Sequence, residues 1–199
     1  MFRRILDPLF EQYRKRRRSR RERDRDSVWQ FEMPVLHAPQ LVDTQFRANA
    51  LNIARQVLGA TATQTGEQAI IKPPGARETP WHQDEAYWSD AYEYASLTVW
   101  MAVDDVDIRN GCLQYVPRSH DSVRPHRLRG HIDGFPELEL IEPPASTPTV
   151  CPLTAGGATI HLPRTMHFAG PNQTTRERRA YVMGFGLPPT PSKSSQGRW

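Results

Sequence analysis

The sequence predicts a mainly β protein, an antiparallel β-sandwich or jelly roll with packed helices. Residues 41–58 carry a single apolar helical face, and short β-like runs separated by Gly, Pro and Asn follow from Gln68 onward. Many short strands after one or two helices are typical of this architecture. The chain has 199 residues, enough for one domain that buries a core without disulfides or structural metals.

The first 26 residues form a basic segment. They hold 11 Arg or Lys and five Asp or Glu residues, a net charge of +6, which leaves −2 for the rest of a chain whose total is +4. Apolar residues recur at helical spacing in its first half: Ile5, Leu6, Leu9, Phe10 and Tyr13. This spacing predicts a short helix docked on the domain. A basic run can bind nucleic acid, but the acid–base alternation of residues 20–26 favours a self-compensated exposed segment. A nucleic-acid partner is therefore not favoured, although the segment leaves it open.

The remaining elements follow in order. The helix of residues 41–58 is expected to end at Gly59. Strands are expected at residues 69–71, 96–103, 112–116, 149–153, 158–162 and 179–187. Residues 119–147 form a long polar insertion, of a length that is usually functional or mobile, and we expect it near the mouth of the barrel as a lid. Three segments result: a basic segment of residues 1–26, helical or disordered, a jelly-roll domain of residues 27–187, and a disordered tail of residues 188–199.

Composition also restricts the cellular setting. No run of about 18 apolar residues is present, and the charged N-terminus is not followed by the apolar region of a secretory signal. Cys112 and Cys151 each lie in an expected strand, which indicates two reduced thiols. We therefore expect a cytoplasmic protein.

The strongest chemical signal is His82-Gln83-Asp84, followed far downstream by His167. Side chains two apart on an extended strand point to the same face, so His82 and Asp84 can bind one metal ion. A histidine from a distant strand would complete two His and one carboxylate with open positions, the ligand set of non-haem Fe(II) oxygenases. His-x-Asp alone is a weak signal, and the sequence around it strengthens the interpretation.

Several blocks between residues 70 and 187 support this reading. They are Ile70-Ile71-Lys72-Pro73-Pro74-Gly75, Thr79-Pro80-Trp81-His82-Gln83-Asp84, Asn110-Gly111-Cys112-Leu113-Gln114-Tyr115-Val116-Pro117-Arg118-Ser119-His120, His167-Phe168-Ala169-Gly170-Pro171-Asn172 and Arg178-Arg179-Ala180-Tyr181. In this order they resemble the phytanoyl-CoA dioxygenase family of 2-oxoglutarate-dependent oxygenases. Arg118 departs from the family pattern, which often has Gly in a Pro-Gly-Ser-His turn.

The resemblance implies a double-stranded β-helix, a jelly roll of the cupin type. It also implies Fe(II) bound by His82, Asp84 and His167, with 2-oxoglutarate and O2 as co-substrates and ascorbate as reductant. Arg178 follows His167 by eleven residues, the family's spacing to the arginine that binds 2-oxoglutarate, and Trp100 stands where a tryptophan lines that pocket. The expected reaction is oxidation of a small organic molecule with release of succinate and CO2.

Alternatives stay open at this point. His161 is a rival distal histidine, although its place between Ile160 and Leu162 favours a packed or hydrogen-bonded role. Arg179 should point to the opposite face of the strand from Arg178. The chain could also be a catalytically silent jelly-roll binding module, or a cupin-type metal-dependent isomerase or hydrolase. The carboxylate of Asp84 disfavours halogenation, because oxygenase-fold halogenases have Gly or Ala there. The arginines and histidines of residues 119–147 hint at an anionic substrate, with a solvated loop as the alternative.

Overall fold

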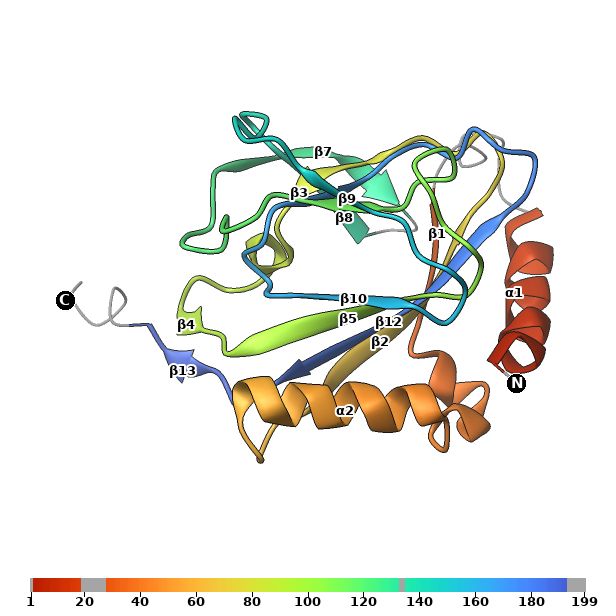
Figure 1. Cartoon of the computed structure of the whole chain (residues 1–199), viewed down its shortest axis with the longest axis horizontal. Helices are drawn as coiled ribbons and strands as arrows, with labels where there is room; N and C mark the ends of the chain where they lie inside the picture. The colour runs from red at the N-terminus through yellow and green to blue at the C-terminus, as the bar shows by residue number, and fades with distance from the viewer. Residues whose placement is uncertain (1, 19–27, 133–134, 193–199) are drawn as a thin grey trace.

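Two antiparallel β-sheets face each other in the computed structural model, which describes residues 2–18, 28–132 and 135–192 (Figure 1). The main sheet has the strand order β1-β2-β12-β5-β10, and the smaller sheet has the order β3-β11-β6-β9. The strands of the main sheet are β1 (Trp29–Glu32), β2 (Thr63–Lys72), β5 (Ser96–Ala102), β10 (Ala158–His161) and β12 (Arg178–Gly186). Those of the smaller sheet are β3 (Thr79–His82), β6 (Leu113–Tyr115), β9 (Thr149–Cys151) and β11 (His167–Ala169). The predicted jelly-roll class is confirmed.

The two faces of the main sheet differ in what covers them. On the outer face, alternate residues of β12 and β5 such as Tyr181, Met183 and Val99 are buried in the principal hydrophobic cluster. Helices α1 (Phe2–Arg18) and α2 (Gln45–Leu58) lie on this side (Figure 1) and contribute Leu6, Leu9, Phe10, Ala50 and Ala54 to the cluster. The inner face, which alternates with the outer one along each strand, is left for the space between the sheets.

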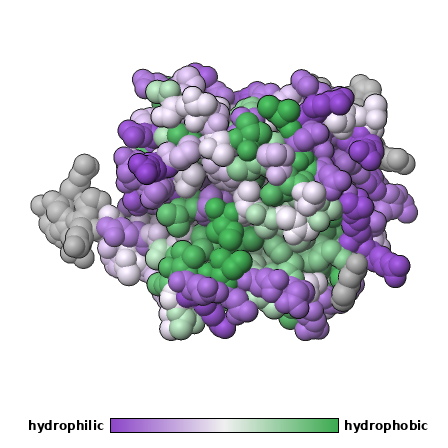
Figure 2. All heavy atoms as spheres, viewed as in Figure 1, coloured by the Kyte–Doolittle hydropathy of each residue, from purple (hydrophilic) through white to green (hydrophobic). Residues whose placement is uncertain are grey.

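Helix α1 confirms the expectation of a docked helix. Its buried residues Leu6, Leu9 and Phe10 follow the helical spacing, and its polar side is anchored by an ion pair between Asp7 and Arg179. The edge of the molecule at which α1 lies is strongly hydrophilic, whereas apolar residues gather in the middle of the same view (Figure 2). Residues 19–27, which carry the rest of the basic segment, lie outside the described residues.

Helix α2 begins four residues later than the apolar pattern indicated. Thr44 is the N-cap, and its side chain accepts a hydrogen bond from the backbone N–H of Arg47 at 3.4 Å. Before it, Pro39–Leu41 forms the short 3-10 helix η3, because Pro39 suits a first helical position but cannot continue an α-helix. Gly59 ends α2 with a φ of 112°, as expected.

The insertion of residues 119–147 differs from the expected loop. It contains the hairpin of β7 (His126–Ile132) and β8 (Phe135–Leu140), which pair antiparallel. The turn before it keeps a glycine-like conformation, since Arg118 has a φ of 61°. Part of the expected tail is also a strand: β13 (Thr190–Pro191) pairs with β4 (Tyr92–Glu93), while residues 193–199 lie outside the described residues. Among the described helices, none is both long and apolar enough to cross a membrane.

Candidate metal and co-substrate site

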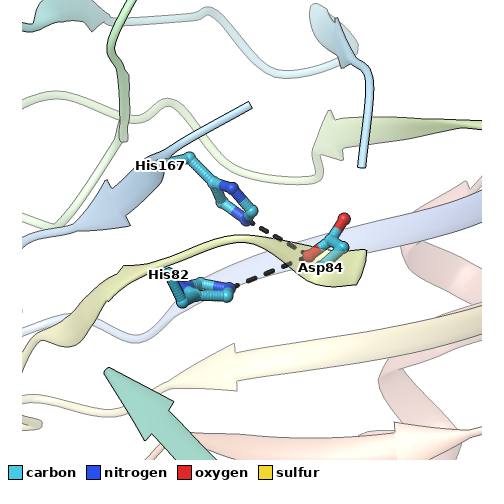
Figure 3. A group of neighbouring side chains, drawn as sticks. All are labelled: His82, Asp84 and His167. Carbon is cyan, nitrogen blue, oxygen red and sulfur yellow. Dashed lines mark ion pairs between the residues drawn. The ribbon is translucent and has the colours of Figure 1, made fainter. Parts of the chain in front are cut away.

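His82, Asp84 and His167 come together between the two sheets (Figure 3). His82 ends β3 and is paired directly with His167 at the start of β11, which brings the two imidazoles side by side with ring centroids 4.1 Å apart. Gln83 is extended and Asp84 opens the short 3-10 helix η4 (Asp84–Tyr87), so the carboxylate faces the same side as His82. One ligand atom from each residue lies within 4.8 Å of the others, close enough to hold one metal ion.

Hydrogen bonds orient both imidazoles toward that point. The Nδ1 atom of His82 lies 2.8 Å from the carbonyl oxygen of Pro80, and that of His167 lies 2.9 Å from the carbonyl oxygen of Thr165. A carbonyl can only accept, so each Nδ1 carries the proton and each Nε2 keeps a lone pair. The two Nε2 atoms lie 3.8 Å and 3.4 Å from Oδ1 of Asp84 (Figure 3). This is the arrangement of metal-binding histidines with second-sphere carbonyl partners.

Burial and charge shift the pKa values of these three groups in different directions. Burial, together with the neighbouring His167, lowers the pKa of His82 to about 3, so His82 is neutral at pH 7. Burial alone would raise the pKa of Asp84, but His167 and His161 outweigh it and hold that pKa well below its usual range. Burial acts against a charged His167, yet Asp84 raises the pKa of His167 above its ordinary value. A raised pKa favours a proton on His167 that would balance the charge of Asp84. A bound metal ion would displace this proton and balance the carboxylate instead.

His161 is a partner of Asp84. Its Nε2 lies 3.2 Å from Oδ2 of Asp84, an oxygen that also accepts a hydrogen bond from the hydroxyl of Thr98 at 3.0 Å. The other ring nitrogen of His161 lies 3.2 Å from the Tyr115 hydroxyl, which in turn lies 2.7 Å from the hydroxyl of Thr159. Oδ2 is thereby occupied, and Oδ1 is left facing His82 and His167. The structure thus gives His161 the hydrogen-bonded role that its apolar neighbours favoured.

Arg178 presents an incompletely paired guanidinium to the same space. The side chain is 2% exposed, and one of its nitrogens, Nη2, donates to the carbonyl oxygen of Gly111 at 3.2 Å. Its Nε and Nη1 atoms have no hydrogen-bond partner among the described residues. Its carbon Cζ lies 5.3 Å from the centroid of the Trp100 ring. Burial lowers the pKa of Arg178 to about 10, which still leaves it charged at pH 7. A buried charge of this kind calls for an anion, and a carboxylate matches the planar donors.

Arg179 points the other way, as expected from strand alternation. It donates to both oxygens of Asp104, at 2.8 Å from Nε and 2.7 Å from Nη2, and its backbone N–H bonds to the same carboxylate at 2.9 Å. Asp7 of α1 completes this pairing. Arg179 therefore joins the N-terminal helix to the sheet, and Arg178 alone of the two faces the cavity.

Lys72 is a residue of the site that sequence reasoning did not assign. It stands opposite Arg178 in the β2–β12 register, is fully buried, and donates to the carbonyl oxygens of Ala169 at 3.1 Å and Gly170. Burial and the charge of Arg178 hold its pKa well below the ordinary value. A single lysine ending the apolar run Ile70-Ile71 was the available signal. Its bonds fix the segment that follows His167.

Gly111 closes the same corner. Its φ is 84°, and a Cβ added there would lie 2.3 Å from the carbonyl oxygen of Gly170. Only glycine fits both the left-handed backbone and this close approach. The carbonyl oxygen of Gly111 is thereby held where Arg178 uses it.

A cavity of about 840 Å³ joins the metal-binding group to Arg178 and Trp100 and extends toward β1, β2 and the β7–β8 hairpin. The hairpin contributes Ile132, Phe135, Pro136 and Glu137 to the wall. The segment expected from the sequence as a lid thus forms part of the cavity wall, and its role as a lid stays a prediction. It is fastened by the ion pair of Arg77 with Glu137 and by a hydrogen bond from the backbone N–H of Leu138 to the Tyr87 hydroxyl at 2.9 Å.

Comparison with known proteins agrees with this geometry. The family model for phytanoyl-CoA dioxygenase (PhyH) matches residues 2–180. The chain belongs to this family. The match covers the metal-binding group and Arg178 as well as helix α1, which lies outside the sequence blocks that first suggested it.

Individual relatives point to the same enzyme class. A probable alpha-ketoglutarate-dependent hypophosphite dioxygenase of Stutzerimonas stutzeri is 27% identical over 157 residues, which are 72% of this chain and 52% of that protein. The chain thus spans about half the length of this curated relative. The crystal structure of EvdO2 from Micromonospora carbonacea var. aurantiaca complexed with 2-oxoglutarate is 34% identical, with a TM-score of 0.77, over 87% of this chain and 74% of that one. The carbocyclase SnoK from nogalamycin biosynthesis shares the fold, at 22% identity and a TM-score of 0.70 over 93% and 73% of the two chains.

Proposed function

We propose that this protein is a non-haem Fe(II)/2-oxoglutarate-dependent dioxygenase that oxidises a small organic molecule. His82, Asp84 and His167 would hold Fe(II), and Arg178 would hold the C5 carboxylate of 2-oxoglutarate. When bound, these two groups with O2 supply the oxidising chemistry, in which 2-oxoglutarate becomes succinate and CO2 and the substrate is oxidised. Ascorbate is the expected reductant, and the cytoplasm the expected compartment.

The observation that carries the proposal is the partly unpaired guanidinium of Arg178 in the same cavity as the two histidines and the carboxylate. Two neutral imidazoles and one carboxylate are the donor set of non-haem Fe(II) oxygenases. A dicarboxylate that reaches both the metal and Arg178 would satisfy both sites at once. The family match and the 2-oxoglutarate complex of EvdO2 support the same choice.

The chain's own residues have distinct tasks in this proposal. The carbonyls of Pro80 and Thr165 hold the imidazoles with Nε2 facing the metal position. Thr98 and His161 hold Oδ2 of Asp84, which leaves one oxygen for the metal and more room for the other ligands. Trp100 shields Arg178 from water, so the guanidinium would bind a carboxylate more strongly than it could in solvent.

Arg178 beside the metal-binding group argues against the two alternative classes. A metal-dependent isomerase or hydrolase of the cupin type needs no dicarboxylate co-substrate that reaches from the metal to a buried arginine. A silent binding module has no need for three aligned ligands with their own hydrogen-bonded supports. Two of the basic side chains of the N-terminal segment serve the fold, since Arg3 is paired with Asp104 and Arg14 with Glu11 and Glu177. Nucleic acid stays an unfavoured partner on the acid–base alternation of residues 20–26.

The cavity does not favour the substrate of the Stutzerimonas relative, hypophosphite, as the substrate of this protein. Hypophosphite is a small inorganic anion, whereas a cavity of about 840 Å³ has the size of sites for drug-sized organic molecules. Arg178 is moreover the one Lys or Arg among the described residues that line it, and 2-oxoglutarate would occupy it. We therefore propose an organic substrate.

Succinate formation tests the proposal. The purified protein is supplied with Fe(II), 2-oxoglutarate, ascorbate and air, and a panel of small organic molecules is screened for succinate above the substrate-free background. We expect substrate oxidation coupled to succinate. Binding of 2-oxoglutarate without turnover for any compound would favour the binding module, and conversion without succinate would favour the isomerase or hydrolase.

A further inference from the structure

The inner face of the main sheet continues well beyond the metal-binding group. Residues paired directly across neighbouring strands point to the same face. By this rule Glu32 of β1, Gln68 of β2, Val182 of β12 and Trp100 of β5 form one row across the cavity floor. All four line the cavity. Strands lie about 4.8 Å apart, so Glu32 stands roughly 14 Å from the strand of Trp100.

A neighbouring row has almost no side chains. Gly66 of β2 pairs with Gly184 of β12, and Gly184 pairs with Thr98 of β5, whose hydroxyl bonds to Asp84. The flanking Glu67 side chain lies on the outer face, where it pairs with Arg47, so a side chain at Gly66 would point inward. A Cβ added at Gly66 would meet nothing within 4 Å. The floor over Gly66 is therefore open between the Asp84 end of the cavity and the row of Gln68 and Glu32. Beside Gly184 it is bordered by the Thr65 hydroxyl, which would lie 3.0 Å from a Cβ added there.

The far end of this floor carries one charged side chain, Glu32, which has no partner among the residues that the structure describes. The side chain of Glu32, which is exposed on the edge strand β1, makes no hydrogen bond or ion pair with another described residue, and partial desolvation raises its pKa above the ordinary value. Glu137 of the hairpin wall is paired with Arg77, and Glu67, whose side chain lies on the outer face, is paired with Arg47. The side chains of Gln30 and Gln68 also have no hydrogen-bond partner among the described residues, and both line the cavity. The polar groups free to meet a substrate there are thus one carboxylate and two amides.

An anionic substrate does not fit these groups. With Arg178 taken by 2-oxoglutarate, the described wall offers no further Lys or Arg. The arginines of the β7–β8 hairpin are matched by acids, Arg127 by Glu139 and Arg129 by Glu78. The sequence hint of an anion site in residues 119–147 is therefore not supported. An approaching anion would instead meet the charge of Glu32.

We propose that the substrate presents a hydrogen-bond donor, a hydroxyl or an ammonium group, to Glu32 and Gln68 while its reacting end lies over Gly66 toward Asp84. This inference rests on the proposed function. Carboxylates accept from both donor types, and hydrogen bonds to charged groups are the stronger ones. Tyr87, Trp88 and Tyr94 line the same cavity and provide apolar ring faces for the carbon skeleton or for a cation.

A matched set of fragments tests the inference without turnover. Zn(II)-loaded protein with 2-oxoglutarate is mixed at millimolar concentration with trans-1,2-cyclohexanediol, cyclohexylamine or cyclohexanecarboxylate, and binding is measured by ligand-observed NMR. We expect the diol or the amine to bind and the carboxylate to be excluded. Preference for the amine identifies an ammonium group, and preference for the diol identifies hydroxyls.

Two variants and a control complete the test. Glu32→Gln should weaken the bound fragment about tenfold or more, since a charged acceptor is lost. Gly66→Leu should exclude it by filling the floor. Glu142→Gln, an exposed glutamate outside the cavity, should change nothing, and thermal melts check that each variant is folded. Three results would overturn the inference. They are binding of cyclohexanecarboxylate, a fragment affinity that is unchanged in Glu32→Gln, and no binding of either the diol or the amine. Failure of the wild-type protein to bind 2-oxoglutarate would instead overturn the proposed function.

Discussion

The two faces of the main sheet differ in whether their charged side chains have partners of opposite charge. On the outer face Arg179 is satisfied by Asp104 and Asp7, and Glu67 by Arg47. On the inner face Arg178, the residue immediately before Arg179 in β12, keeps two of its nitrogens without a hydrogen-bond partner among the described residues, although it is buried. Glu32 is likewise without a partner among the described residues. Since burial of a charge is costly unless it is paired, the outer charges serve the fold, and the buried charge of Arg178 requires an anion that is not part of the chain. Glu32 is exposed, so its carboxylate is available to a ligand without needing one.

The largest effect expected on the inner face concerns the metal. His167→Ala removes one of the three proposed metal ligands. Besides His82, which is itself a proposed ligand, no other described imidazole faces Oδ1 of Asp84 to replace it, so the substitution should abolish most binding of Fe(II) or of its substitute Mn(II). Calorimetric titration with Mn(II) in air measures this. Retention of near wild-type affinity would show that His167 does not bind the metal and that another imidazole does.

The second effect separates the two adjacent arginines. Arg178→Ala should raise the dissociation constant for 2-oxoglutarate by roughly 30- to 4,000-fold, because loss of one partner of a buried charge pair costs about 2–5 kcal/mol. Metal affinity should change little. Arg179→Ala is the matched control, since its side chain leaves the strand on the outer face. Equal losses for the two variants would mean that Arg178 is not the carboxylate ligand.

Much of the fold could be predicted because it follows from local patterns. The apolar spacing of α1 and the Gly59 terminus of α2 depend on nearby residues alone. The β7–β8 hairpin was missed because the segment is rich in charged residues, such as Arg127 and Glu139, which pair with each other across the strands. Leu138 and Leu140 do alternate with glutamates, and this was the available signal for a strand. Strands β3 and β11 are only four and three residues long, too short to show a period of two.

Some residues of the site could likewise be predicted from the sequence, and others could not. His82 and Asp84 could be paired by their spacing, and His167 and Arg178 by a family resemblance. The tasks of Lys72 and Glu32 could not be read in this way. Each depends on a register between strands far apart in the chain, Lys72 opposite Arg178 and Glu32 opposite Gln68. Sequence shows that these side chains are charged, but only the structure shows that they lack a partner of opposite charge.

A third, smaller effect tests the support of Asp84. His161→Leu removes the hydrogen bond to Oδ2 while keeping an apolar side chain in its packed position. Loss of a second-sphere partner of a metal ligand typically costs 10- to 100-fold in metal affinity, and we expect a reduction in that range for Mn(II). Tyr115→Phe removes only the outer bond to His161 and should have a weaker effect. A loss as complete as that of His167→Ala would make His161 a metal ligand itself.

The smallest effect is expected on the outer face, and it concerns stability. Burial acts to raise the pKa of Asp104, but Arg179 and Arg3 outweigh it and lower the pKa below the ordinary value of an aspartate. A carboxyl whose pKa is depressed by folding stabilises the protein above its unfolded pKa of about 3.9, and that contribution is lost as the pH falls through the lower, folded pKa. Asp104→Asn should therefore lower the free energy of unfolding at pH 7 by about 1–2 kcal/mol, the range for a partly exposed, hydrogen-bonded pair.

The pH dependence distinguishes this charge effect from a loss of packing. The difference in melting temperature between the wild type and Asp104→Asn should be largest near pH 7 and shrink as the pH is lowered below about 4, because the wild-type carboxyl is then increasingly protonated. The affinity for 2-oxoglutarate at pH 7 should stay the same, since Asp104 and Arg179 face α1 while Arg178 faces the cavity. A difference in melting temperature that does not change with pH would assign the role of Asp104 to shape. A weaker affinity for 2-oxoglutarate would show that the two faces of β12 are coupled. The charges that stabilise the fold and the charge that binds the ligand could then not be treated as independent.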